Sequence, residues 1–207
     1  SINVESGNNY YEADGKALYE KSTNTLKTLV NTDSYDVKAG TKIIFGDAIL
    51  GRRVRTLTLP TSLETISGFA LTGVKLLEEI IIPENVTLID ACVFDSAEDL
   101  NNVYIKSSSL LIGNESFKNL PTGSSIYVVS KEIADKFTAE KYTSANTTIY
   151  YPPEVTTQPA DSIINLGHKA TFTVTATSVY DTTVSDTATI STPVSNTLSG
   201  SVTNKGL

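Results

Sequence analysis

Apolar residues return along this chain at a fixed interval. Triplets of the form apolar–x–apolar recur at steps of 23 residues, beginning at Leu57, Ile80, Val103, Ile126 and Ile149. Three further apolar columns keep the same step, and the longest of them runs through Ile43, Ile66, Ile89 and Ile112. Four columns in one register indicate a tandem repeat with a unit of 23 residues.

A unit of this length is too short to close a core of its own. It buries its apolar side only by stacking on its neighbours, so the repeat predicts a solenoid. Each triplet predicts a short strand with two inward side chains and one outward side chain. Stacked units then form a parallel sheet with strands at 57–59, 80–82, 103–105, 126–128 and 149–151. We expect Ile89 and Phe94 to point into the core from the opposite side.

The unit that runs from Ile80 to Leu100 has the spacing of a known family. It opens with Ile-Ile-Ile-Pro, and its apolar positions continue at Val86, Ile89, Val93, Phe94 and Leu100. This pattern resembles the BspA-type leucine-rich repeat, and the resemblance covers about residues 1–151. It implies an α/β repeat fold, a leucine-rich-repeat solenoid with a parallel sheet, whose repeats occupy about residues 34–149.

Both ends of the array differ from its centre. The resemblance implies an opening β-hairpin at about residues 10–33, and Gly15 and Asn24 suit its turns. At the other end, Ser130 is a good N-cap, and Ile133 and Phe137 share one helical face. We therefore predict a helix over residues 130–141 that caps the open end of the solenoid.

A change of composition follows Tyr151-Pro152-Pro153. The segment 152–207 is rich in serine and threonine, and residues 169–177 alternate strictly between threonine or lysine and apolar residues, which predicts a half-buried antiparallel strand. The segment Thr157-Gln-Pro and the later Gly167-His-Lys-Ala-Thr-Phe resemble the opening of a bacterial immunoglobulin-like domain. The resemblance implies a small all-β immunoglobulin-like segment over 152–207, either a truncated domain or a smaller β-unit.

Charge argues against several partners. The net charge is −7, and the only arginines are Arg52, Arg53 and Arg55. Nucleic acid and anionic membranes reward dense positive charge, so we expect no nucleic-acid partner. No apolar run approaches the ~20 residues that cross a bilayer, so we expect no membrane insertion. The chain starts at Ser1 without a signal peptide, which we interpret as a processed form of a secreted or cell-surface protein.

Candidate chemistry is sparse. One cysteine, Cys92, and one histidine, His168, argue against a metal site, a cofactor and Cys-His catalysis, so we expect no enzyme. Apolar neighbours predict that Cys92 is buried and unligated. A calcium or glycosidase site is one interpretation of the clustered carboxylates, and solvated turns are the simpler one; the residues are Glu78, Glu79, Asp95, Glu98 and Asp99.

The outward residue of each strand is the best candidate for binding. At steps of 23 residues this column reads Tyr35, Thr58, Ile81, Tyr104, Tyr127 and Tyr150. Tyrosine offers a large contact area and a hydroxyl group, and the resemblance implies partner binding on the sheet face. The simpler alternative is that tyrosine and threonine pair well in sheets. A ligand, a second copy of the chain or the C-terminal segment are the candidates to cover the row.

Two classes of function remain open. The first is a bacterial surface adhesion module that recognises a host or environmental protein or glycan through the repeat sheet. The second is a structural spacer that displays other domains and has no ligand of its own.

Overall fold

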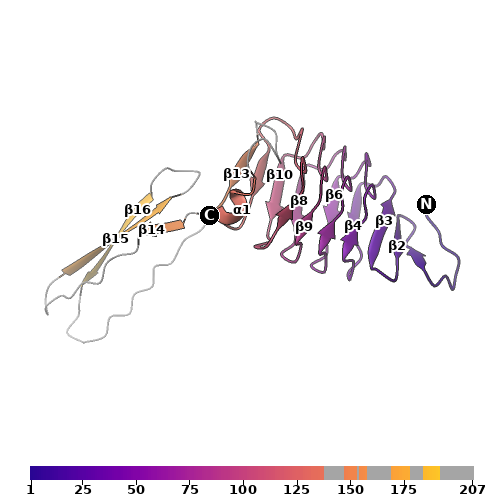
Figure 1. The fold of residues 1–207 in the computed structure, drawn as a ribbon, viewed down its shortest axis with the longest axis horizontal. Helices are drawn as coiled ribbons and strands as arrows, with labels where there is room; N and C mark the ends of the chain where they lie inside the picture. Colours follow the sequence, from indigo (N-terminus) through magenta and orange to yellow (C-terminus); the bar gives the residue numbers. More distant parts are fainter. Residues whose placement is uncertain (138–146, 153, 158–168, 178–183, 192–207) are drawn as a thin grey trace. The chain divides into compact units, whose positions relative to one another are not determined.

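The computed structural model describes residues 1–137, 147–152, 154–157, 169–177 and 184–191. The chain divides into two compact units, Ser1–Pro152 and Pro153–Leu207. The first unit is a stack of turns that progresses along the sequence from the N-terminal strands to helix α1 (Figure 1). This confirms the predicted repeat solenoid.

One wall of the solenoid is built from the predicted strands. It contains β4 Ser34–Asp36, β6 Thr56–Thr58, β8 Glu79–Ile82, β10 Asn102–Ile105, β12 Ser125–Tyr127 and β13 Thr148–Tyr150. Strand β4 pairs with β6, and β8, β10, β12 and β13 form a second sheet, with every pair parallel. The bounds differ from the predicted ones by no more than one residue.

The opposite wall is a seven-stranded sheet. It contains β1 Tyr11–Ala13, β2 Ala17–Glu20, β3 Thr25–Leu29, β5 Ile43–Ile44, β7 Thr65–Ile66, β9 Leu88–Ile89 and β11 Leu111–Ile112. Strands β1, β2 and β3 are antiparallel, and β3 pairs in parallel with β5. The turns at Gly15 and Asn24 have φ of +91° and +51°, a region that glycine and asparagine tolerate. The N-terminal strands therefore extend the second wall directly.

The core lies between the two walls. The second inward residue of each strand is buried: Leu59, Ile82, Ile105 and Val128. Ile89 and Phe94 are fully buried as predicted, and the Phe94 ring stacks on Phe117 with centroids 5.2 Å apart.

The turns that join the walls have a repeating left-handed backbone. Two columns of residues have positive φ, namely Asp47, Phe69, Cys92 and Glu115, and then Gly51, Gly73, Ser96 and Asn119. Backbone N–H groups bond from turn to turn here, as from Phe94 to the Ser116 carbonyl at 2.7 Å. The turn geometry is thus repeated whether or not glycine occupies the position.

The first repeat is one residue shorter than the others. Tyr35 is paired with Leu57, and Ile44 with Ile66, so these steps are 22 residues. The prediction that Ile43 belongs to the inward column is therefore wrong, because fully buried Ile44 takes that place. From Ile49 to Val54 the chain advances five residues, whereas it advances six between the equivalent Leu71 and Leu77.

The segment after the last complete turn begins as a helix. Helix α1, Lys131–Ala134, is a single turn in which the Ser130 side chain accepts a hydrogen bond from the Ile133 N–H at 3.3 Å. Ile133 and Phe137 are buried, and Phe137 packs on Phe117 at 5.4 Å between centroids. The predicted helix over 130–141 is therefore too long, because α1 ends at Ala134 and residues 135–136 form a turn. Residues 138–141 lie outside the described residues, and the capping role of the segment stays a prediction.

The second unit contains three described strands. Strands β14 Glu154–Thr157, β15 Lys169–Thr177 and β16 Val184–Ser191 form an antiparallel sheet with β15 in the middle. Strand β15 coincides with the predicted alternating strand. The immunoglobulin-like identity of the unit stays a prediction.

Candidate functional site

The strands of the first wall present alternate residues to the outer side of the sheet, which we call the sheet face. The register places Ile81 beside Tyr104, Tyr104 beside Tyr127, and Tyr127 beside Tyr150. Thr58 is exposed on β6, and Ile81 is 47% exposed. The structure therefore brings five of the six candidate residues into one row.

Tyr104, Tyr127 and Tyr150 form a continuous stack, the tyrosine ladder. Their ring centroids are 4.8 and 5.1 Å apart, with interplanar angles of 11° and 20°. Because the inner faces of the rings cover one another, the side chains are only half exposed. At Tyr104 and Tyr127 the ladder therefore offers ring edges and phenol oxygens to a partner.

A polar row lies beside the tyrosine ladder. Asn102, Ser125 and Thr148 are paired in register on β10, β12 and β13, and Glu79 continues the row on β8. Burial raises the pKa of Tyr104, and the nearby Tyr127 and Glu79 raise it further. The sheet face thus combines aromatic edges with hydrogen-bonding groups, a composition typical of binding surfaces.

The prediction that Tyr35 lies on the sheet face is wrong. Tyr35 is 6% exposed and aligned with the inward Leu57, because the first step is 22 residues. The exposed residues of β4 are Ser34 and Asp36, and Asp36 is the one paired with Thr58. A signal for this was present, since Tyr35-Asp36-Val37 is itself an apolar–x–apolar triplet whose outer members are both buried.

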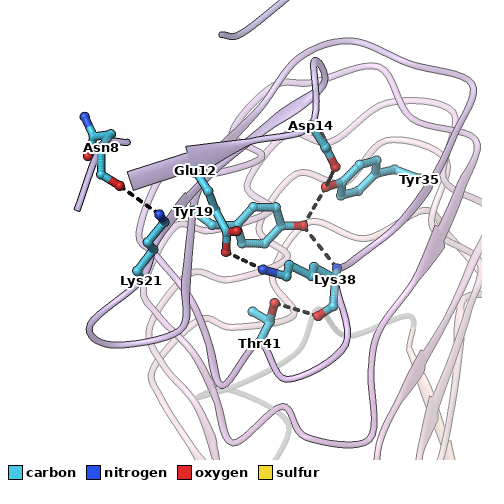
Figure 2. A network of polar contacts seen from close by, with 8 residues as sticks. All are labelled: Asn8, Glu12, Asp14, Tyr19, Lys21, Tyr35, Lys38 and Thr41. Carbon is cyan, nitrogen blue, oxygen red and sulfur yellow. Dashed lines mark hydrogen bonds and ion pairs between the residues drawn. The ribbon is translucent and has the colours of Figure 1, made fainter. Parts of the chain in front are cut away.

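Buried Tyr35 instead belongs to a chain of hydroxyl groups at the N-terminal end of the solenoid (Figure 2). Its hydroxyl donates to Asp14 Oδ2 at 2.6 Å and lies 2.5 Å from the Tyr19 hydroxyl. Since the Tyr35 proton goes to the carboxylate, Tyr19 donates to Tyr35 and accepts from the Lys38 N–H at 3.1 Å. The chain of bonds joins β2, β4 and the turn between β1 and β2.

Ionisation is shifted throughout this network. Burial raises the pKa of the Tyr19 and Tyr35 hydroxyls, and for Tyr35 the hydrogen bonds to Asp14 and Tyr19 raise it further. Burial acts to raise the pKa of Asp14, but hydrogen bonds from Tyr35, Ala17 and Lys16 outweigh that effect and lower it. The network therefore consists of a carboxylate and two neutral hydroxyls near neutral pH, which suits a structural connection.

A shallow hollow opens on the sheet face between β6 and β8. Strand β6 belongs to the two-stranded sheet and β8 to the four-stranded one, so the pairing of neighbouring strands is interrupted here. We call this interruption the seam. The hollow is lined by Thr58 and Ile81 in its centre, with Arg55, Glu79, Glu84 and Lys106 around it.

Sequence reasoning missed several exposed apolar side chains outside the sheet face. Leu111 is 70% exposed on β11, and Phe45, which follows β5, is 47% exposed. Lys27 Nζ lies 3.3 Å from the centroid of the Phe45 ring, a cation–π contact. Phe69 in the next turn is 50% exposed. For Leu111 the signal was its place directly before the inward column, where Leu111-Ile112 are two consecutive apolar residues.

The prediction that Cys92 is buried is also wrong. Cys92 is partly exposed, in the left-handed column with φ +56°. Its apolar neighbours Val93 and Phe94 are fully buried, so the exposure of Cys92 does not follow from theirs. Burial, together with Glu115 and Asp95, raises the pKa of the Cys92 thiol.

In the part of the chain that the structure describes, no group of three or more histidine, cysteine or carboxylate side chains is arranged to hold a metal ion. None of the helices in the same part has the length and apolar character needed to cross a bilayer.

Comparison with known proteins identifies the repeat. The pattern described as BspA type Leucine rich repeat region matches residues 23–157 in six copies. None of the curated proteins matches the chain. Among solved structures, the chain is similar to the pneumococcal vaccine antigen PcpA, with 19% identity and a TM-score of 0.36 over 71% of this chain. The match covers 49% of that chain, so this chain spans about half its length. Since the six copies extend over more than half of the sequence, the chain belongs to the BspA-type leucine-rich-repeat family.

Proposed function

We propose that this chain is a non-catalytic binding module of a secreted or cell-surface protein, which contacts a protein or glycan partner through the sheet face. The observation that carries the proposal is the tyrosine ladder, three stacked rings on the outer side of β10, β12 and β13. Membership of a repeat family supports it, because solenoids provide extended binding surfaces.

The chemistry of the ladder suits recognition. A stacked tyrosine is already held in place by its neighbours, so it loses little conformational entropy when a partner binds. Its hydroxyl adds a hydrogen bond that the polar row of Asn102, Ser125 and Thr148 supplements. We propose no cofactor, no nucleic-acid partner and no membrane insertion, and we assign a capping role to the segment after Ser130.

The stack also bears on the spacer alternative. Because the rings cover one another, the ladder stabilises the sheet whether or not a partner binds, by about 0.5–1.5 kcal/mol for each aromatic pair. A tyrosine ladder that binds no partner is therefore compatible with a structural spacer, and only a binding measurement separates the two functions.

A matched pair of double variants provides that measurement. The purified chain is applied to an array of glycans and extracellular-matrix proteins, alongside Tyr104→Ser/Tyr127→Ser. The control is Tyr10→Ser/Tyr11→Ser, which removes two exposed tyrosines near the N-terminus, 72% and 39% exposed. We expect the ladder variant to lose binding to the array components that the wild type and the control retain.

Circular dichroism of both variants checks that the solenoid still folds. Equal binding by wild type and ladder variant would contradict the proposal. Absence of binding by the wild type to every array component would favour the spacer.

A further inference from the structure

The seam between β6 and β8 coincides with a change in repeat length. The step across β4 and β6 is 22 residues, and the step from Leu57 on β6 to Ile80 on β8 is 23. The extra residue in the turn before β8 accompanies a strained backbone at Leu76, with φ +71°, whose N–H is held by Asp99 Oδ2 at 2.7 Å. The longer turn is thus fixed in place directly before β8.

The interrupted sheet leaves a hollow with a distinctive distribution of charge. Because the strands are parallel, Arg55 and Glu79 lie at the end where β6 and β8 begin. Lys106 and Glu84 lie at the other end, after β10 and β8. Within the described residues none of these four side chains takes part in an ion pair.

The centre of the hollow is apolar and accessible. Ile81 is 47% exposed there. Leu57 on β6 and Leu59 directly after it keep 6% and 7% of their surface exposed, whereas Ile82 on β8 keeps none. Thr58 adds a hydroxyl group beside them. An apolar centre between two ends, each with one unpaired cation and one unpaired carboxylate, is the feature that a partner would match.

We infer that the seam is a binding site for an extended polypeptide segment that places an apolar side chain on Ile81 and charged side chains of both signs at the two ends. This inference rests on the proposed function and narrows it to a protein partner at one place on the sheet face. A polypeptide supplies apolar, acidic and basic groups within a few residues, so it complements both members of each charge pair.

A neutral glycan fits the hollow less well. It offers hydroxyl groups to the four charges but no charge of opposite sign, and it leaves the exposed Ile81 without an apolar contact. The inference therefore predicts binding that weakens as ionic strength rises, since exposed charges are screened over roughly 10 Å at 0.1 M salt.

Selection from a random-peptide phage library on the immobilised chain at low salt tests the inference. We expect the enriched peptides to carry an apolar residue flanked by residues of both charges. Their synthetic versions should bind Ile81→Ser and Arg55→Gln about tenfold more weakly than wild type, the loss typical of a residue central to an interface.

Two variants outside the hollow serve as controls. Arg53→Gln changes an exposed arginine two residues from Arg55, and Leu111→Ser removes an exposed apolar side chain from the opposite wall. Both should bind the peptides as the wild type does. The inference is overturned if no peptide is enriched, or if the enriched peptides bind Ile81→Ser as well as wild type.

The outcome is distinguishable from that of the proposed function. Suppose that Tyr104→Ser/Tyr127→Ser loses array binding and Ile81→Ser retains it. The proposed function, binding through the sheet face, would then stand, and the inference that the partner binds at the seam would be overturned.

Discussion

Truncation of Phe94 to alanine provides the strongest energetic test of the repeat register. The Phe94 ring is fully buried, stacks on Phe117 at 5.2 Å, and Phe117 in turn packs on Phe137 at 5.4 Å. Loss of burial costs about 1.5–3 kcal/mol, and the cavity left in a close-packed core brings the total to roughly 3–5 kcal/mol. The loss of the stacking contact with Phe117 is included in that total.

The control for this variant lies one turn earlier. Phe69→Ala removes the same ring from a side chain that is 50% exposed, so we expect a loss of about 1 kcal/mol or less. Urea unfolding followed by tyrosine fluorescence and circular dichroism gives both values, since the chain has no tryptophan. The transition of the first unit is the one to compare, because the chain has two units.

We expect Phe94→Ala to lower the free energy of unfolding more than Phe69→Ala does. If Phe94→Ala lowered the free energy of unfolding no more than Phe69→Ala, Phe94 would not be a core residue and the repeat register would be refuted.

Three further predictions concern the turns and the N-terminal network. In the native state Cys92 should react with a thiol reagent, more slowly near neutral pH than an ordinary exposed thiol because its raised pKa leaves less thiolate, and faster as pH rises; complete protection until unfolding would contradict its position. Ser96→Gly should raise the free energy of unfolding by roughly 0.5–1 kcal/mol, because glycine adopts positive φ without strain; a lower value in urea unfolding would count against the left-handed turn. The Asp14 pKa is lowered by folding, so its contribution is present above the ordinary value of 3.8 and lost as pH falls through the lower folded value. Acid unfolding of Asp14→Asn should therefore show a flatter pH dependence, and an unchanged dependence would mean that the Tyr35 hydrogen bond is absent in solution.

The stacking of turns was predictable because its cause is local to the sequence. Every turn must place apolar side chains inward, so columns such as Leu57, Ile80 and Val103 repeat the same chemistry at one interval. The outward tyrosines were predictable for the same reason, since alternation along a strand fixes the face of each residue once its neighbours are buried.

The burial of Tyr35 could not be predicted from a constant interval of 23 residues, because the first repeat is one residue shorter. The missing residue lies in the turn between Ile49 and Val54, which has no regular alternation to reveal a change of length. The polar chain from Asp14 to Tyr19 likewise joins residues from separate strands, which a sequence interval does not relate.

The exposure of Cys92 depends on a left-handed backbone conformation that its residue type does not predict. Positive φ is expected of glycine, yet Phe69, Cys92 and Glu115 occupy the same left-handed column. At these positions the stacked turns determine the backbone, and the side chain follows it to the surface.

Protection of individual tyrosines during binding tests the central claim most directly. The protein is bound to a matrix protein or glycan that the array identifies, treated with a tyrosine-nitrating reagent, and compared with the free protein by mass spectrometry. The account predicts that binding protects Tyr104 and Tyr127, whereas Tyr10 at the N-terminus reacts equally in both states. Undiminished nitration of Tyr104 and Tyr127 in the bound state would show that the partner contacts another surface and would contradict the account.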